Sequence, residues 1–350
     1  MSLKHLSSQT IRPLHQLILS QAMDVGPEGS FSALTPDLRI FLYKNELTSL
    51  PPELGRLHNI TVLSLRNNAL TELPSFIGNL RRLKELNIAG NQIEVLPWEL
   101  LDLYNRGHTQ SLRLTLRPNP LCQPLDTEVL AHKPALDLRS IDQVRIMVER
   151  LQVVLRDVAC HGFPIYETML MCVANGWLHH KRLHPDRPAT PLRAASSDLS
   201  YFDVDGILVR TLRQSFSDAP SEPSHEPIFA DPSLPPASAI SAPSLFELAA
   251  RSCAGSPYHN QLSDLLPCDA PGTVVAALDR ALEAKERGLP RCSVCSKEYL
   301  VKRAEWIEYW SLHVGQEIIP ARLVFTPFLR RACSWGCALR AYDAPPEWCI

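Results

Sequence analysis

The chain has 350 residues, of which 45% are apolar, and its 35 Lys and Arg residues nearly balance 37 Asp and Glu residues, giving a formal net charge of −2. This length allows two or three domains, and a nearly neutral chain has no global field that favours nucleic acid or an anionic membrane. We find no uninterrupted apolar run of about eighteen residues and no signal-like N-terminus, so we predict a protein of the cytoplasm, with the nucleus as the alternative.

Residues 1–36 precede the first clear repeat, and their apolar stretch "LHQLILSQAMD" predicts a degenerate repeat or an N-terminal cap. A stack of repeats needs such a cap because its terminal turn would otherwise expose an apolar face. We therefore expect this segment to close the N-terminal end of the repeats.

Residues 37–125 contain a regular repeat, in which Asn45, Asn68 and Asn91 are each 23 residues apart. The same spacing relates the neighbouring apolar positions and prolines: Leu42, Leu65 and Ile88; Leu47, Leu70 and Ile93; Leu50, Leu73 and Leu96; Pro51, Pro74 and Pro97. A fourth turn at "LRLTLRPNPLC" has Asn119 in the asparagine position. This recurrence predicts a leucine-rich repeat solenoid, in which stacked turns bury the leucines and each asparagine amide bonds backbone groups at a bend.

Strand alternation predicts which side chains point out from the concave side of these repeats. The candidate partner-binding residues on this side are Phe41, Tyr43, Lys44, Arg66, Asn67, Asn87 and Arg117. Aromatic and basic side chains suit a protein partner of acidic character. The alternative is an ordinary solvated face, because any leucine-rich repeat must present some side chains there.

Two apolar runs predict a helical segment over residues 126–184. Ile141, Val144 and Val148 recur at helical spacing, and a second run reads "PIYETMLMCVANGW". We expect these helices to cap the C-terminal end of the repeats. Residues 185–243 are rich in Pro, Ser and Ala, and we predict a disordered linker there, with a short strand at "GILVRTL", because the segment has little apolar surface to offset its ordering entropy.

Residues 244–345 are predicted to combine helices with a metal-binding part. Ser244 followed by Glu247 is a capping box, which marks the start of a helix. A second helix is predicted across "TVVAALDRALEAKERG" and ends at Gly288. Its expected inward residues are Val274, Val275, Leu278, Ala281 and Leu282.

Four of the ten cysteines form two close pairs in this region. Cys292 and Cys295 flank two residues, and Cys333 and Cys337 flank three. Two such loops can supply four thiolates to one tetrahedral ion, so we predict a structural zinc ion in a zinc-ribbon-like domain, with strands between the pairs. The alternatives are ordinary free or buried thiols, and a site in which His313 replaces one cysteine.

The residues also resemble known families. The repeats resemble the intracellular leucine-rich repeat class of Ras-group and Scribble-like proteins. The stretches "LPWELLDL", "SLFELAARSC", "LLPCDAP", "CSVC" and "TPFLRRACSWGC" resemble uncharacterised fungal leucine-rich repeat proteins and animal substrate receptors of elongin–cullin ubiquitin ligases. That resemblance implies an elongin C-docking helix.

The docking helix of those receptors carries a small residue, then leucine, then cysteine after three positions. Ser244 and Leu245 match this pattern, whereas Ala249 stands where the family has cysteine, and Cys253 follows later. Leu245 and Leu248 are therefore candidate partner-binding residues for elongin C or a cullin. The alternative is that these two leucines pack inside their own domain.

Taken together, the sequence predicts an α/β protein with a leucine-rich repeat solenoid and a small α+β zinc-ribbon-like domain. We expect a protein–protein interaction module, with a substrate adaptor of a cullin-RING ubiquitin ligase as its sharpest form. The alternatives are a signalling scaffold of the Ras-group type and a nucleic-acid-binding zinc ribbon, in which Trp306 and Trp310 would stack on bases. We expect no enzyme, because the phosphate-loop, nucleophile-elbow and zinc-protease motifs are missing from the sequence.

Overall fold

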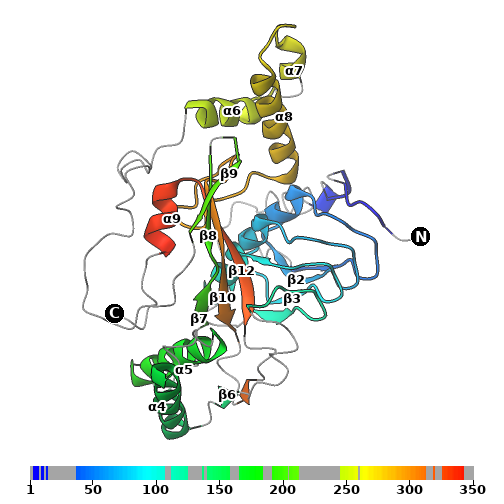
Figure 1. Cartoon of the computed structure of the whole chain (residues 1–350). Helices are drawn as coiled ribbons and strands as arrows, with labels where there is room; N and C mark the ends of the chain where they lie inside the picture. Colours follow the sequence, from blue (N-terminus) through cyan, green and yellow to red (C-terminus); the bar gives the residue numbers. More distant parts are fainter. Residues whose placement is uncertain are drawn as a thin grey trace, which may run out of the picture. The chain divides into compact units, whose positions relative to one another are not determined.

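The structure is a computed structural model. It describes residues 3–7, 9–11, 13–14, 37–106, 112–124, 136–137, 140–157, 165–183, 191–203, 205–212, 245–258, 261–312, 318–319 and 325–342. The contacts between residues divide the chain into two units. Figure 1 shows the chain coloured by residue number. The first unit comprises Met1–Leu121, Ser244–Ser293 and Lys297–Leu300, and the second comprises Cys122–Pro243, Val294–Ser296 and Val301–Ile350.

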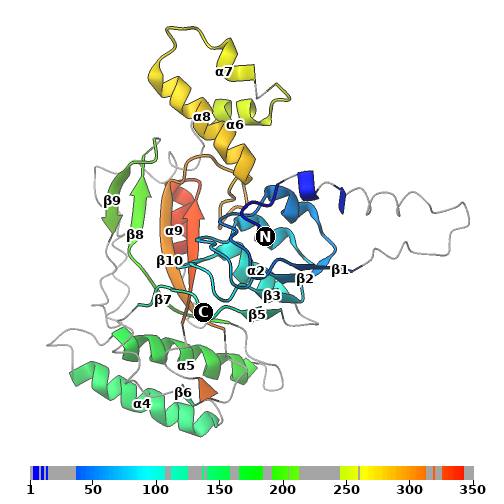
Figure 2. The ribbon, with the colours of Figure 1, turned by 90° about the vertical axis from the view of Figure 1, so that its right-hand side faces the viewer.

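The repeats of the first unit form a four-stranded sheet in the order β1-β2-β3-β5, visible in Figure 2. All of its strand pairs are parallel, and their bounds are β1 (Leu38–Phe41), β2 (Ile60–Ser64), β3 (Glu85–Asn87) and β5 (Arg113–Thr115). The returning segments of successive turns are η1 (Pro52–Arg56), η2 (Ser75–Asn79), and β4 (Leu96–Pro97) followed by α2 (Trp98–Arg106). The repeats therefore have the mixed α/β character that the sequence predicts.

The spaced leucines form the core of this unit. Leu63, Leu86 and Ile88 are completely buried, because alternate strand residues point to the same face. The leucine positions after each asparagine are also fully buried: Leu47, Leu70 and Ile93. The 23-residue spacing thus marks positions that stack on their equivalents in the next turn.

Each repeat asparagine bonds the backbone of two turns. The Nδ2 of Asn91 donates to the carbonyl oxygens of Leu65 and Ile88 at 3.0 and 2.8 Å, and its Oδ1 accepts from the Leu70 amide at 3.1 Å. Asn68 and Asn119 make the equivalent three bonds. These bonds satisfy backbone groups that would otherwise be buried without partners at each bend.

The N-terminal residues continue this series of asparagine bonds by one turn. The Leu3 amide donates to Asn45 Oδ1 at 2.9 Å, as the Leu47 amide does to Asn68. The Glu46 amide donates in turn to the Leu3 carbonyl at 3.0 Å. Leu3 therefore takes the place that a preceding repeat would fill.

One position per turn adopts a left-handed backbone. Lys44 and Asn67 have φ of 56°, and Gly90 has φ of 71°. A Cβ at Gly90 would clash with Oδ1 of Asn67. The third turn therefore needs glycine for space as well as for its backbone angle.

Three helices complete the first unit: α6 (Leu245–Gly255), α7 (Leu262–Leu265) and α8 (Gly272–Arg287). Ala277, Leu278 and Ala281 of α8 are buried, whereas Val274 and Val275 are 40% and 39% exposed, so the prediction that these two valines point inward is wrong. α8 ends at Gly288, where a Cβ would lie 3.1 Å from that of Pro52. Contact with η1 therefore groups α8 with the repeats, although the sequence suggested a separate domain with the cysteines.

An antiparallel sheet forms the centre of the second unit. β10 (Ala304–Ser311) pairs with β12 (Thr326–Ala332), β7 (Leu192–Ser196) and β8 (Leu199–Phe202), and β8 also pairs with β9 (Leu208–Leu212). The short strands β6 (Leu136–Asp137) and β11 (Ile318–Ile319) pair separately. Two of these strands, β7 and β8, lie where we predicted a disordered linker, and that prediction is wrong there. The third, β9, confirms the short strand predicted at "GILVRTL".

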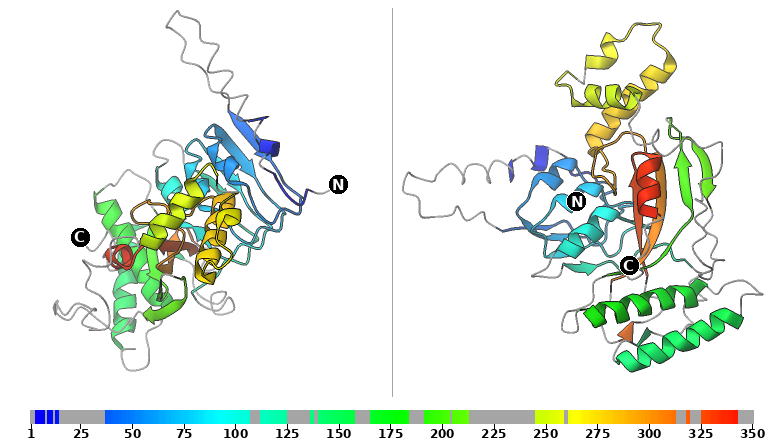
Figure 3. Two further views of the ribbon diagram at one scale, coloured as in Figure 1. Left: turned by 90° about the horizontal axis from the view of Figure 1, so that it is seen from above. Right: turned by 90° about the vertical axis from the view of Figure 1, so that its left-hand side faces the viewer.

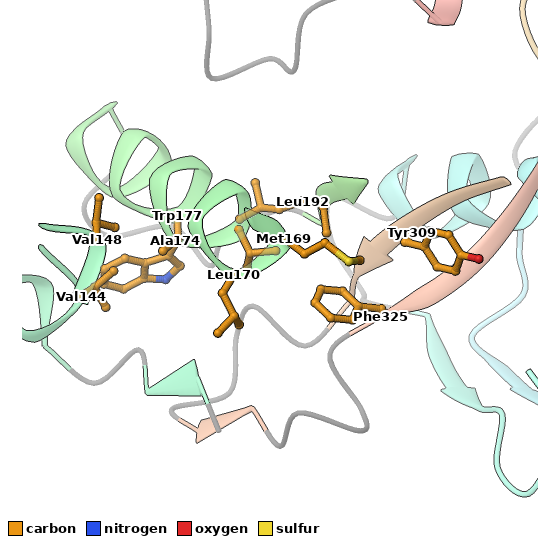
Figure 4. Packing of buried hydrophobic residues seen from close by; sticks show 11 residues of the cluster. Val144, Val148, Met169, Leu170, Ala174, Trp177, Leu192, Tyr309 and Phe325 are labelled. Atoms are coloured by element: carbon orange, nitrogen blue, oxygen red, sulfur yellow. The ribbon is translucent and has the colours of Figure 1, made fainter. Parts of the chain in front are cut away.

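The predicted middle helices are α4 (Ile141–Asp157) and α5 (Ile165–Leu183), which run side by side in Figure 3. Their apolar faces meet, and Trp177 lies beside Val144 and Val148 in Figure 4. Met169 extends the same buried cluster to Phe325. The helices therefore belong to the core of the second unit, and the prediction that they cap the repeats is not supported by this packing.

Candidate metal centre and partner-binding face

The first cysteine pair lies on a tight loop. An isolated bridge joins Arg291 to Glu298, and the Cys292 amide donates to the Lys297 carbonyl at 2.8 Å. Ser296 takes a left-handed φ of 61°, which reverses the chain. The loop holds the thiols of Cys292 and Cys295 close to each other.

The second pair lies at the start of a helix, α9 (Trp335–Tyr342). Ser334 is its N-cap, because the Ser334 Oγ accepts a bond from the Cys337 amide at 3.1 Å. Cys333 precedes this N-cap and Cys337 lies in the first turn of α9, so the capped start of the helix brings the two thiols together. The three-residue spacing of this pair therefore reflects the start of a helix, and the prediction of two similar loops, as in a zinc ribbon, is wrong for the second pair.

All four cysteine Sγ atoms lie within 4.8 Å of one another. Cys295 and Cys333 are 3.5 Å apart, and Cys333 and Cys337 are 3.9 Å apart. Sulfur atoms at about 2.3 Å from a tetrahedral ion lie roughly 3.8 Å from each other. The structure thus brings together every predicted ligand in an arrangement that fits a metal ion, while the alternative ligand His313 lies outside the described residues.

Positive groups lie beside the second cysteine pair. The α9 N-terminus carries the positive end of the helix dipole, and Arg340 Nη2 lies 3.5 Å from Cys337 Sγ. Cys292 and Cys337 are buried.

Strand β8 packs against the second cysteine pair, a contact that the sequence did not indicate. The indole Nε1 of Trp335 donates to the Phe202 carbonyl at 3.0 Å, and its ring meets Tyr201 edge-on at 5.7 Å. No signal in the sequence links these residues, because more than a hundred positions separate them.

A fully buried carboxylate, that of Glu308, lies on strand β10. The Glu308 oxygens accept bonds from the indoles of Trp306 and Trp310 at 3.0 and 2.9 Å. Arg330 lies 3.0 Å and Arg193 lies 3.7 Å from Glu308 Oε1. Four donors from three strands therefore surround this charge, and sequence reasoning did not identify it.

The same network removes the basis of the nucleic-acid hypothesis. Trp306 is only 1% exposed, and both indoles bond Glu308. Lys302 and Arg331 pair with Glu305 at 2.6 and 3.4 Å. The buried Trp306 ring is thus unable to stack on bases, Trp310 is half-buried, and much of the local positive charge is neutralised.

The predicted partner-binding residues of the repeats lie on one side of the parallel sheet. Phe41 and Tyr43 are 59% and 55% exposed. The other exposed members are Lys44, Arg66, Asn67 and Arg117. Asn87 is half-buried, and its Oδ1 accepts from the Ala89 amide at 3.2 Å.

The two predicted docking leucines lie on α6. Leu248 is 47% exposed, and Ala249 beside it is also exposed. Glu247, the residue before Leu248, accepts a bond from the Leu300 amide at 2.6 Å, which anchors the first turn of the helix. The exposure of Leu248 contradicts the alternative in which it packs inside its own domain, while the Leu245 side chain lies outside the described residues.

Within the described residues, the helices lack a stretch that is long and apolar enough to cross a bilayer. Residues 58–98 match the family model of leucine rich repeats (2 copies). No curated protein sequence matches the chain significantly. The chain therefore carries leucine-rich repeats in the segment where the leucines and asparagines stack. Leucine-rich repeats generally mediate protein–protein interaction.

Proposed function

We propose that this protein is a protein–protein interaction module whose repeat sheet binds a partner protein and whose four cysteines hold a structural zinc ion. The observation that carries the proposal is the parallel sheet β1-β2-β3-β5, one face of which buries leucine while the other presents exposed aromatic and basic side chains. We also propose that the protein binds its partner without catalysing a reaction.

The binding proposal is tested by changing the outward side chains alone. A double variant, Tyr43→Ala with Arg66→Ala, removes two exposed groups and leaves the buried leucines intact. Its control is Arg56→Ala, because Arg56 is exposed on η1, outside the sheet. Proximity labelling should lose specific partners with the double variant and keep them with the control; identical partner lists from both variants would reject the proposal.

The donor set supports zinc over other metals. Four thiolates suit a borderline-soft ion in tetrahedral geometry, and a complete set of protein ligands leaves no position for a reactive water. The ion would hold the loop of Cys292 and Cys295 to the start of α9. Because free thiols persist in a reducing compartment, the proposal also assigns the protein to the cytoplasm or nucleus.

Metal analysis of the purified full chain tests the zinc assignment. We expect about one zinc per chain in the wild type and much less in Cys295→Ser. Cys268→Ser is the matched control, because Cys268 is an exposed cysteine outside the cluster. Equal zinc in the two variants would show that the cluster is not the site.

The finer form of the proposal is a substrate adaptor that docks elongin C through α6. The exposed Leu248 supports it, since a leucine on an amphipathic helix can insert into a partner groove. In a pull-down of the full chain, Leu248→Asp should lose elongin C, whereas Val275→Asp, at an exposed valine of α8, should retain it. If the wild type does not recover elongin C, this form is excluded.

The alternative is a signalling scaffold of the Ras-group type, which needs only the repeat face. The regular sheet and its family match support this alternative. It predicts that Leu248→Asp leaves every partner in place while the double variant removes them. Loss of partners with Leu248→Asp would instead favour the adaptor.

A further inference from the structure

The outward side chains of the repeat sheet form aligned rows across its strands. Strand register gives a first row of Arg39, Val62, Glu85 and Arg113 and a second row of Phe41, Ser64, Asn87 and Thr115. Backbone bonds from Lys44 to Arg66 and from Asn67 to Ala89 continue the alignment. They give a third row that begins Tyr43, Arg66, Ala89, and the bond from the Gly90 amide to the Pro118 carbonyl places Pro118 next, with Arg117 one residue before it.

The β1 end of this face projects, whereas short side chains lie along the later strands. Ser64, Ala89 and Thr115 are short side chains that are buried or half-buried. Phe41 and Tyr43 project at the β1 end, with exposed fractions of 59% and 55%. The face therefore offers an aromatic end and a floor that another backbone can approach closely.

Charge is distributed unevenly over the same rows. Arg39, Lys44, Arg66, Arg113 and Arg117 are exposed cations on or directly beside these rows. Glu85 is the one acidic residue in the rows, although the chain as a whole has a net charge of −2. A face with this excess of cations attracts a partner with opposite charge.

We propose that this face binds a short, extended, acidic peptide segment that lies across the strands. An apolar or aromatic side chain of the segment packs against Phe41 and Tyr43, and its Asp or Glu carboxylates bond Arg66, Arg113 and Arg117. This inference rests on the proposed function and names the class of partner for the same face. Four strands about 4.8 Å apart span roughly 14 Å, which is the length of about four extended residues.

A peptide fits this face better than a nucleic acid does. Glu85 lies in the first row between Val62 and Arg113, where it would repel the continuous charge of a phosphate backbone. A peptide carries its carboxylates on separate side chains and can place a neutral residue there. Arginine also binds carboxylates through two parallel bonds.

Fluorescence anisotropy with the full chain tests this inference. One labelled probe has phenylalanine followed by four acidic residues, and its matched control has asparagine and glutamine instead of the acids. We expect saturable binding of the acidic probe, at least tenfold weaker binding of the amide control, and weakening with added salt. A five-nucleotide single-stranded DNA should bind more weakly than the acidic probe.

Three variants assign the binding to the proposed residues. Arg66→Glu should weaken the acidic probe at least tenfold, whereas Arg56→Glu, the same reversal on η1, should not. Tyr43→Ala should weaken a probe that carries phenylalanine more than one that carries alanine. Circular dichroism confirms that each variant keeps its fold, as expected for exposed positions.

The inference is overturned by equal binding of the acidic and amide probes, by equal effects of Arg66→Glu and Arg56→Glu, or by preferential binding of DNA. Competition with the natural partner separates this failure from failure of the proposed function. If face variants lose a partner protein that the acidic probe does not displace, the protein-binding function stands and the acidic segment is wrong.

Discussion

The two units of this protein reach their folds through contacts of different range. In the repeat unit, each strand pairs with a strand from the next turn, and Asn68 and Asn91 each bond the turn before. In the second unit, β10 pairs with β7 and β8 from more than a hundred residues earlier. A repeated local spacing therefore defines the first unit, whereas the second unit depends on a few strand pairs between distant segments.

If the two units differ in this way, the largest loss of stability should follow loss of the metal ligands. Cys295→Ser should remove the zinc and destabilise the contact between the first cysteine loop and α9 by several kcal/mol, because structural zinc contributes directly to folding. Hydrogen exchange should show lost protection in β10 and α9, with the β2 and β3 amides unchanged. Cys268→Ser should change neither, and equal loss in both units would break the comparison.

Glu308→Ala should have the next largest effect. It leaves the partly buried Arg193 and Arg330 without the carboxylate, at a cost of about 3 kcal/mol. Urea denaturation of the second unit measures this change. Glu305→Ala is the control, because that half-exposed carboxylate pairs with Lys302 and Arg331 nearer the surface, and an equal loss there would contradict the role of burial.

Loss of one repeat asparagine should destabilise the protein less, because the asparagines of the other turns make equivalent bonds. Asn91→Ala leaves the Leu70 amide and two carbonyl oxygens without this partner, so we expect a loss of about 2–4 kcal/mol. Asn45→Ala, at the N-terminal end of the ladder, should cost less because Asn45 is more exposed. Equal losses of stability at the two positions, measured by denaturation, would contradict the inference that burial strengthens the asparagine bonds.

Gly90→Ala should cost about 1–3 kcal/mol, because the new methyl group meets Asn67 in a left-handed backbone. Gly272→Ala is the control, since a Cβ there meets nothing within 4 Å. Thermal unfolding compares the two variants. A neutral result at Gly90 would mean that the third turn can relax, and that the repeats are less tightly coupled than we infer.

The smallest effect concerns a single proton. Burial, with a further contribution from Cys122, raises the pKa of Tyr309 above the ordinary tyrosine value. The unfolded tyrosine ionises first, so the stability provided by Tyr309 is present at neutral pH and is lost as the pH rises above about 10. An absorbance titration should show one late tyrosine that is lost in Tyr309→Phe and kept in Tyr43→Phe, a control at an exposed tyrosine.

The cysteine cluster shows how much of the site the sequence could predict. All four ligands followed from their spacing, because close cysteine pairs have few other uses in a reducing compartment. The helical origin of the second pair did not follow, since a C-x-x-x-C spacing fits a loop as well as a helical turn. The Glu308 network was also missed, because its partners come from three strands whose pairing no local pattern indicates.

The sequence by itself determined the repeats, their inward leucines and bonding asparagines, and the four converging thiols. In each case the information is periodic or close in sequence, and neighbouring turns repeat the same contact. Only the tertiary structure decided that Leu192–Ser196 and Leu199–Phe202 form strands, that α4 and α5 share a core with β7, and that Trp306 is buried. Those outcomes depend on which distant segments meet, because burial and strand pairing there are set by partners more than a hundred residues away.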